Sequence, residues 1–170
     1  MTRTVTAIMA LLLLLPFPGE AQQRKSQPRT TRKPAAKAVK QPAASQAVGQ
    51  LAEQLKLVNQ FLYVYGKVAA SLDDAEQRVK RGEAQQEDMI GVGQSKAAVL
   101  ASVQDLRAGI GKLAAAFRTD DRLKTHTIKL IAAAEAASEA EQLIRGSRYD
   151  DAGRSLLVAA ARLVEVLAAV

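Results

Sequence analysis

Apolar residues recur in steps of three and four along most of the chain. The first run keeps these steps from Leu51 to Val79, and Glu76 is its one polar member. The second run repeats them from Met89 to Phe117, with Lys96 as its one polar member. Such spacing gathers apolar side chains on one face of an α-helix and packs neighbouring helices at about 20°. The pattern therefore predicts two long helices of about 35 residues each.

Two further helical segments follow, and both are shorter. The third is expected from about Thr119 to Arg145, and its alanine-rich middle, IAAAEAASEAEQ, would let a neighbouring helix approach closely. The fourth is expected from about Tyr149 and has apolar residues around more of its circumference than the others. We therefore expect the fourth helix to be the most buried. The residues that widen its apolar stripe are Leu157, Val158, Val164 and Leu167.

Local signals mark the ends of these helices. Gly82 follows the basic stretch VKR and Gly146 follows LIR, which fits a glycine stop after a cationic last turn. Acidic pairs after Thr119 and Ser147 suit the first turns of the third and fourth helices. Because the connections are short, successive helices should be antiparallel neighbours. The predicted fold class is all-α: an antiparallel up-down-up-down four-helix bundle with two long and two shorter helices, preceded by a disordered tail.

The stretch LIRGSRYDDAGRSLLVAA resembles the inter-helix turn of a tetratricopeptide repeat. The matching residues are Gly146, Tyr149, Ala152, Leu156 and Ala159, at that repeat's glycine, tyrosine, alanine, bulky apolar and alanine spacings. The resemblance covers one turn, occurs once and lacks the trailing proline. The first two helices are also too long for a repeat of about 34 residues. The resemblance implies a tight helical hairpin around Tyr149, and it identifies no family.

Glycines interrupt the second helix twice, as GVG at 91–93 and GIG at 109–111. The two motifs lie eighteen residues apart and therefore on one face of the helix. Each glycine inside a helix costs about 0.5–1 kcal/mol relative to alanine. A close helix contact, a kink or a ligand near the backbone should compensate, and the sequence leaves these three explanations open.

The helix lengths give the first of these glycine motifs a predicted contact. If the third helix starts at Thr119, it stops about nine residues short of the far end of the second helix. The turn from Gly146 to Tyr149 then lies beside the GVG motif. We predict that Tyr149 packs against Gly91 or Gly93, whose missing side chains make room for its ring.

The first 21 residues have the three-part pattern of a secretory signal peptide. Arg3 supplies a positive charge, an apolar run of eleven residues extends from Val5 to Leu15, and Pro16 and Pro18 then interrupt it. A membrane-spanning helix needs about 20 apolar residues, so this run is too short for an anchor. We expect cleavage after Ala21, which would leave an exported chain, periplasmic or extracellular, with no membrane span.

The net charge of +7 belongs to one segment. Residues 46–170 carry sixteen bases and sixteen acids, whereas residues 22–45 carry seven bases and no acid. Three prolines and few apolar residues predict that this tail is disordered. The predicted organisation is a signal peptide at 1–21, a basic tail at 22–45 and a helical bundle at 46–170. The candidate polyanion contacts in the tail are Arg24, Lys25, Arg29, Arg32, Lys33, Lys37 and Lys40.

Two functions of this tail remain open. It lacks the aromatic residues on which single-stranded nucleic acids stack, and export favours envelope polymers or lipid head groups as anionic ligands over nucleic acid. Weak contact with such a polyanion is one interpretation. The other is a solvated spacer, because a run of like charges carries no specificity of its own.

The sequence carries no motif for catalysis, a metal or a cofactor. It has no cysteine, one histidine, no Glu-x-x-His pair and no glycine-rich phosphate loop. His126 could act as an acid or base only with partners, and it is expected to be a partly exposed residue near a helix start. The adjacent acid pairs do not have the alternating spacing of a calcium loop. We therefore expect no enzyme and no cofactor, but an interaction or structural role in the cell envelope.

Overall fold

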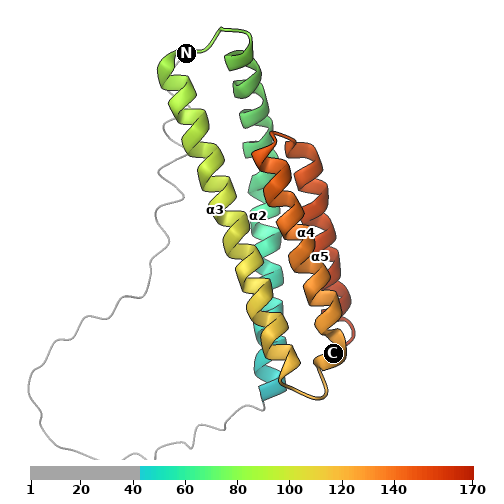
Figure 1. Ribbon diagram of the computed structural model, residues 1–170. Helices are drawn as coiled ribbons and strands as arrows, with labels where there is room; N and C mark the ends of the chain where they lie inside the picture. The colour runs from blue at the N-terminus through green and yellow to red at the C-terminus, as the bar shows by residue number, and fades with distance from the viewer. Residues whose placement is uncertain (1–42) are drawn as a thin grey trace, which may run out of the picture. The chain divides into compact units, whose positions relative to one another are not determined.

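The computed structural model describes residues 43–170, and all the regular elements in that range are helical. Four α-helices follow one another: α2 (Ala43–Lys80), α3 (Gln86–Arg118), α4 (Thr127–Arg145) and α5 (Tyr149–Leu167) (Figure 1). The first two have 38 and 33 residues and the last two have 19 each. The predicted all-α bundle with two long and two shorter helices is confirmed. The proposed signal peptide and the tail as far as residue 42 lie outside the described residues.

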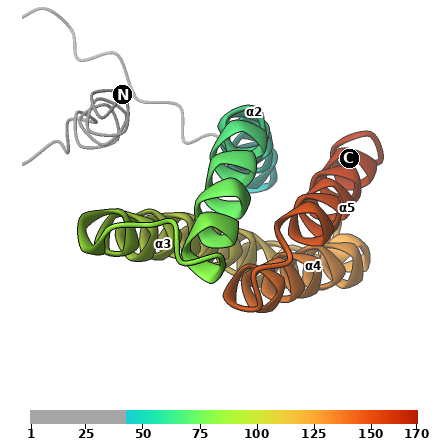
Figure 2. The same cartoon turned by 90° about the horizontal axis from the view of Figure 1, so that it is seen from above.

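The helices form a ring in chain order. α2 contacts α3, α3 contacts α4, α4 contacts α5, and α5 closes the ring against α2 (Figure 2). Each helix runs antiparallel to both of its neighbours, as short connections require. The first helix begins at Ala43, so the last three residues of the predicted tail belong to α2.

The predicted stripes form the core. All six α3 stripe positions from Val99 to Phe117 are buried, and Val103, Ile110 and Phe117 have no exposed surface. On α4 one face of the alanine-rich middle is buried, through Ala133, Ala136, Ala137 and Ala140. The core residues fall into two clusters. One surrounds Phe117 at the end of the bundle where α3 ends, and the other surrounds Tyr65 nearer the α4–α5 turn.

Two helix ends share the same hydrogen-bonded motif, but only one uses glycine as predicted. After α2, Gly82 takes the left-handed conformation with φ of 73°. After α4, Gly146 has an ordinary φ of −81°, and Ser147 takes the left-handed position with φ of 59°. The Arg148 N–H then bonds the Leu143 carbonyl at 2.8 Å, which closes a Schellman motif. A left-handed serine is strained and needs support from its surroundings.

The third helix starts later than predicted. Residues 119–123 form turns, η1 (Lys124–His126) is a short 3-10 helix, and α4 begins at Thr127 instead of Thr119. Thr119 closes α3, since its hydroxyl donates to the Ala116 carbonyl at 2.8 Å. Asp120 Oδ1 accepts the Arg122 N–H at 2.9 Å, a local bond that competes with helix formation.

The helix expected to be the most buried, α5, shares that place with α4: eight of the 19 residues are buried in each, against seven of 33 in α3. The steps of three and four predict an inner stripe, which is buried as far as Val166: Ala152, Leu156, Ala159, Leu163, Val166 and Val170. Three of the four residues that widen the stripe lie on the solvent side, since Leu157 is 58% exposed, Val158 50% and Val164 49%. The fourth, Leu167, is partly buried and packs against the core. The helix therefore carries apolar residues on two sides, and only one side packs within the bundle.

Candidate functional site

A cluster of polar side chains lies where the α4–α5 turn meets the long α2–α3 hairpin. The ammonium of Lys96 is 3.1 Å from Glu76 Oε1. Tyr149 donates its hydroxyl hydrogen to the same oxygen at 2.6 Å, and Lys96 also donates to Ser147 Oγ at 2.9 Å. We call Glu76, Lys96, Ser147 and Tyr149 the turn cluster. It joins α2, α3 and the start of α5.

The two polar members of the predicted stripes are therefore partners. The side chains of Glu76 and Lys96 are only 13% and 22% exposed, so both charges are largely removed from water. Such a pair is tolerated when each charge has further hydrogen bonds, which Tyr149 and Ser147 supply here. The bond from Lys96 also holds the strained Ser147 in place.

The electrostatics of the turn cluster favour a fixed ion pair. Burial alone would raise the pKa of the Glu76 carboxyl, but hydrogen bonds from Ser147, Tyr149 and Lys96 together hold that pKa below its usual range. Burial and the bond to Glu76 raise the pKa of the Tyr149 hydroxyl far above its usual value. A general acid or base works best with a pKa near the operating pH. The pKa values of both groups are shifted away from neutral pH, so the turn cluster suits a structural role, holding the α4–α5 turn against α2 and α3, better than proton transfer.

Tyr65 ties the same turn to α2. Its hydroxyl donates to the backbone carbonyl of Tyr149 at 2.8 Å in a buried setting. Burial, with a smaller contribution from the charge of Asp150, raises the pKa of Tyr65 to about 12. The turn is thus anchored through both a side chain and a backbone group.

A second polar cluster lies between α3 and α4 around Glu141, whose side chain is 8% exposed. Gln104 donates to Glu141 Oε1 at 2.8 Å, Arg145 pairs with the same oxygen, and Arg107 lies 3.5 Å from Oε2. Hydrogen bonds from Gln104 and Arg145, with the positive charges of Arg107 and Arg145, hold the pKa of Glu141 below its usual range. Sequence analysis missed this residue. A signal was present, because Glu141 follows Leu130 by eleven residues and continues its buried stripe.

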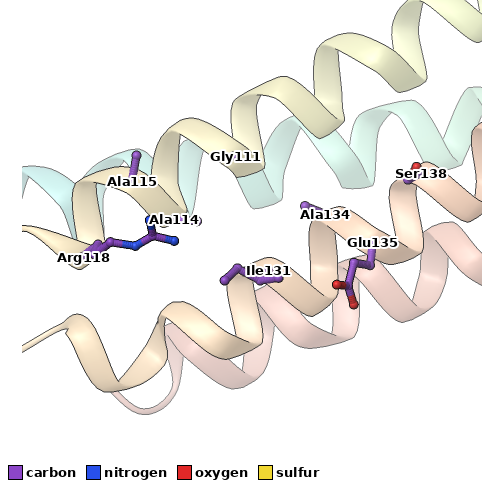
Figure 3. Close-up of a pocket in the computed structure, with 8 residues that line it drawn as sticks. All are labelled: Gly111, Ala114, Ala115, Arg118, Ile131, Ala134, Glu135 and Ser138. Carbon is purple, nitrogen blue, oxygen red and sulfur yellow. The ribbon is translucent and has the colours of Figure 1, made fainter.

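An open groove of about 420 Å³ runs between the lower halves of α3 and α4 (Figure 3). In this view Arg118 and Ile131 reach into the space between the two helices. The remaining lining is mostly small: Gly111, Ala114 and Ala115 of α3 with Ala134, Glu135 and Ser138 of α4. The groove brings together one base, one acid and one hydroxyl, and its lining suits an apolar side chain better than a reaction.

The predicted contact between Tyr149 and the GVG motif is wrong. A Cβ added at Gly91 or Gly93 would meet nothing within 4 Å. The Tyr149 ring instead lies beside the Lys96 side chain, with its centroid 5.8 Å from Lys96 Nζ. The turn that includes Gly146 lies farther from the N-terminus of α3 than predicted, because α4 begins at Thr127 and has 19 residues instead of about 26.

The second glycine motif has a definite packing explanation. A Cβ at Gly109 would lie 2.8 Å from the amide carbon of Gln54, whose Nε2 donates to the Leu106 carbonyl at 3.2 Å. Gln54 is buried, so its amide needs this space. Close approach is therefore the explanation at Gly109. At Gly111, two residues on, the Cβ direction is open.

The remaining predicted site residues are the seven bases of the tail, and His126 is the one histidine that the sequence analysis considered. The seven basic residues of the tail lie outside the described range. His126 is partly exposed in η1, immediately before α4, and lines an open pocket beside Leu123 and Val170. Within residues 43–170 no three histidine, aspartate or glutamate side chains are grouped so as to hold a metal ion.

None of the helices in the described part of the chain combines the length and the apolar character needed to cross a bilayer. Comparison of the chain with protein-family models, with curated proteins and with solved structures yields no match.

Proposed function

We propose that this chain is an exported, non-catalytic helical bundle that binds a partner protein in the cell envelope. The outer face of α5 is the observation that carries the proposal. Leu157, Ala161, Val164 and Ala168 are exposed and follow one another in steps of four, three and four. That is the spacing with which a helix packs against another helix.

The surroundings of this outer stripe favour a protein contact. Isolated apolar residues are normal on a surface, whereas a contiguous apolar strip marks an interaction site. Val158, beside the stripe, is half exposed, and Arg154 and Glu165 supply the polar margin. An apolar centre with a charged rim is the usual composition of a protein interface. The expected occupant is an amphipathic helix of another envelope protein.

A pull-down from envelope extract tests this function. The bait is the full chain, and the test variant is Leu157→Lys combined with Val164→Lys. The control is Ile128→Lys on α4, because Ile128 is 76% exposed and lies outside the α5 stripe. The unmodified chain and the control should retain the same partner, and the α5 variant should lose it while keeping its helical circular dichroism. Equal retention by the α5 variant would rule out this surface. N-terminal sequencing of the exported chain should begin at Gln22.

A polyanion-binding function through the tail is the second candidate, and the separation of charge supports it. Seven bases and no acid lie in residues 22–45, whereas the rest of the mature chain is balanced. Binding that depends on these bases should weaken steeply with salt, because counterions are released. Deletion of residues 22–42 should abolish it and leave thermal stability unchanged. Salt-insensitive binding, or binding that survives the deletion, would exclude the tail as the ligand site.

A further inference from the structure

The α2–α3 hairpin extends beyond the α4–α5 turn (Figure 1). Lys96 contacts Ser147 in that turn, and α3 begins ten residues earlier, at Gln86. Ten residues of helix correspond to about 15 Å. The last part of α2 rises beside this segment. We call residues 77–95 the hairpin tip, since they lie beyond Glu76 and Lys96, which bond to Tyr149 at the start of α5 and to Ser147 in the α4–α5 turn.

The apolar stripes continue into the hairpin tip, where α4 and α5 no longer cover them. Val79 and Val92 are partly exposed, Met89 is 52% exposed and Ile90 is 55% exposed. Farther down α3 the same stripe is buried from Val99 onward. The tip therefore has half of a four-helix core and lacks two helices to complete it.

We propose that a second copy of this chain supplies those two helices, in a head-to-head dimer joined through the hairpin tips. The two copies are related by a two-fold axis perpendicular to the helices. In this arrangement the inverted α3 of the second copy continues the direction of α4, and its inverted α2 continues that of α5. Every neighbouring pair of helices stays antiparallel, as in the bundle below. The surface is separate from the outer face of α5, and the proposal does not depend on the proposed function.

The charges at the helix ends fit this arrangement. α3 begins with Glu87 and Asp88, and it would meet the end of α4, whose last turn carries Arg145. Opposite helix-dipole ends and opposite side-chain charges meet at this junction. Because the axis is two-fold, the same contact occurs twice.

The other junction has the reverse order of charges, with Asp150 as its main acid because Asp151 already pairs with Arg148 and Arg154 in the same chain. α2 ends with Arg78 and Lys80, and it would meet the start of α5, which carries Asp150 and Asp151. Bases again face acids at both symmetry-related places. From residue 77 to residue 95 the tip holds three bases and three acids, so two tips would not repel one another. A second copy thus fits this surface electrostatically without any other component.

The packing expected at the α3–α3 contact is also complementary. If the tips overlap over their whole length, the axis passes near residue 91, midway between Gln86 and Lys96. Met89 of one copy then lies opposite Gly93 of the other. The Cβ direction of Gly93 is open in the single chain, so a methionine side chain has room there. This contact would compensate for an otherwise unexplained glycine inside a helix.

The overlap is short, so the dimer should depend on concentration. Stable interfaces usually bury about 800 Å² on each partner, and roughly three turns of two helices provide less than that. Sedimentation velocity of the full chain over a wide concentration range should show a shift from the mass of one chain toward twice that mass. A chain that stays monomeric at every concentration would overturn the proposal.

A matched pair of glycine variants tests the location of the contact. Gly93→Glu places a charge where Met89 of the second copy should lie, and it should hold the chain at the monomer mass. Gly49→Glu is the control, because Gly49 also lies inside a helix with open space around its Cβ direction, at the other end of α2. Both variants should keep the fold, since glutamate favours helix more than glycine does. If Gly93→Glu dimerised as strongly as the control, the tip would not be the interface.

Single-cysteine variants test the register, because the chain has no cysteine of its own. Met89→Cys and Gly93→Cys chains, mixed and mildly oxidised, should form a disulfide-linked pair several times faster than either variant alone. Val158→Cys, at a similarly exposed position on α5, serves as the control partner. If the Met89→Cys chain linked to Val158→Cys as fast as to Gly93→Cys, the proposed register would be wrong.

Discussion

The GIG motif of α3 allows one substitution to be compared at two neighbouring positions. Gly111→Ala adds a methyl group into open space, whereas Gly109→Ala places it against the buried amide of Gln54. At both positions alanine removes the backbone entropy cost of glycine, which favours the folded state by about 0.5–1 kcal/mol. Gly111→Ala should therefore stabilise the protein by that amount.

At Gly109 the same entropic stabilisation is opposed by the larger cost of losing a buried hydrogen bond. The methyl group must push the Gln54 amide away from the Leu106 carbonyl, to which it donates at 3.2 Å. Losing a buried hydrogen bond and leaving the amide without a partner costs about 1–3 kcal/mol. The net effect of Gly109→Ala should be a destabilisation of about 1–2 kcal/mol.

Urea denaturation followed by circular dichroism measures both free energies of unfolding. A double-mutant cycle then identifies the cause, because Gly109→Ala in a Gln54→Ala background should regain the stabilisation seen for Gly111→Ala. The expected coupling between the two positions is about 1–3 kcal/mol. If Gly109→Ala and Gly111→Ala were equally stable, or if the cycle showed no coupling, the role assigned to Gln54 would be refuted.

Three further changes test the core and the polar clusters. Tyr65→Phe removes the buried bond to the Tyr149 carbonyl and should lower the free energy of unfolding by about 1 kcal/mol, whereas Tyr63→Phe, 76% exposed, should leave it unchanged. Leu163→Ala empties a fully buried position and should cost about 2–5 kcal/mol in the same denaturation assay. Because the folded-state pKa of Glu141 is lowered, its stabilising effect is present above the unfolded pKa of about 4.3 and is lost as pH falls through the folded value. Glu141→Gln should flatten the acid side of the stability profile measured from pH 6 downward, and an unchanged acid slope would contradict this assignment.

Helix type and core positions could be predicted because they depend on local periodicity. The spacing of Val103, Ile110 and Phe117 identifies one face of a helix without any knowledge of its neighbours, and these residues are fully buried. Short connections then leave few arrangements other than an antiparallel ring. The fold class therefore follows from features that lie within about four residues of each other.

The orientation of α5 could not be predicted in the same way. This helix has one stripe through Leu156 and Leu163 and another through Leu157 and Val164, and both have the steps of three and four. Periodicity shows that each stripe is contiguous but not which of them faces the other helices. That choice depends on where α2 and α4 lie, which is tertiary information. The structure places the first stripe inward and leaves the second exposed.

The predicted start of α4 was wrong for a different reason, and this error also made the predicted contact of Tyr149 wrong. Asp120 suits a first helical turn, but its carboxylate bonds the Arg122 N–H and stabilises a turn instead. The sequence does not decide between these two uses of an aspartate. Because α4 then starts eight residues later, its C-terminal end lies nearer the C-terminal end of α3 than predicted. Tyr149 consequently meets Lys96 and not the GVG motif.

The Glu76–Lys96 pair could be predicted from the sequence if side-chain direction is taken into account. The connection between α2 and α3 is centred on residue 83, so Glu76 lies seven residues before the centre and Lys96 thirteen after it. Their backbones therefore differ in height by six residues, or about 9 Å, which alone argues against contact. Side chains in a helix lean toward its N-terminus, however, and these helices are antiparallel. Glu76 leans down α2 and Lys96 leans up α3, and the two long side chains close the gap to 3.1 Å. Opposite charges in two paired stripes can therefore meet when the residue on the first helix lies nearer the connection than its partner on the second, as Glu76 does relative to Lys96.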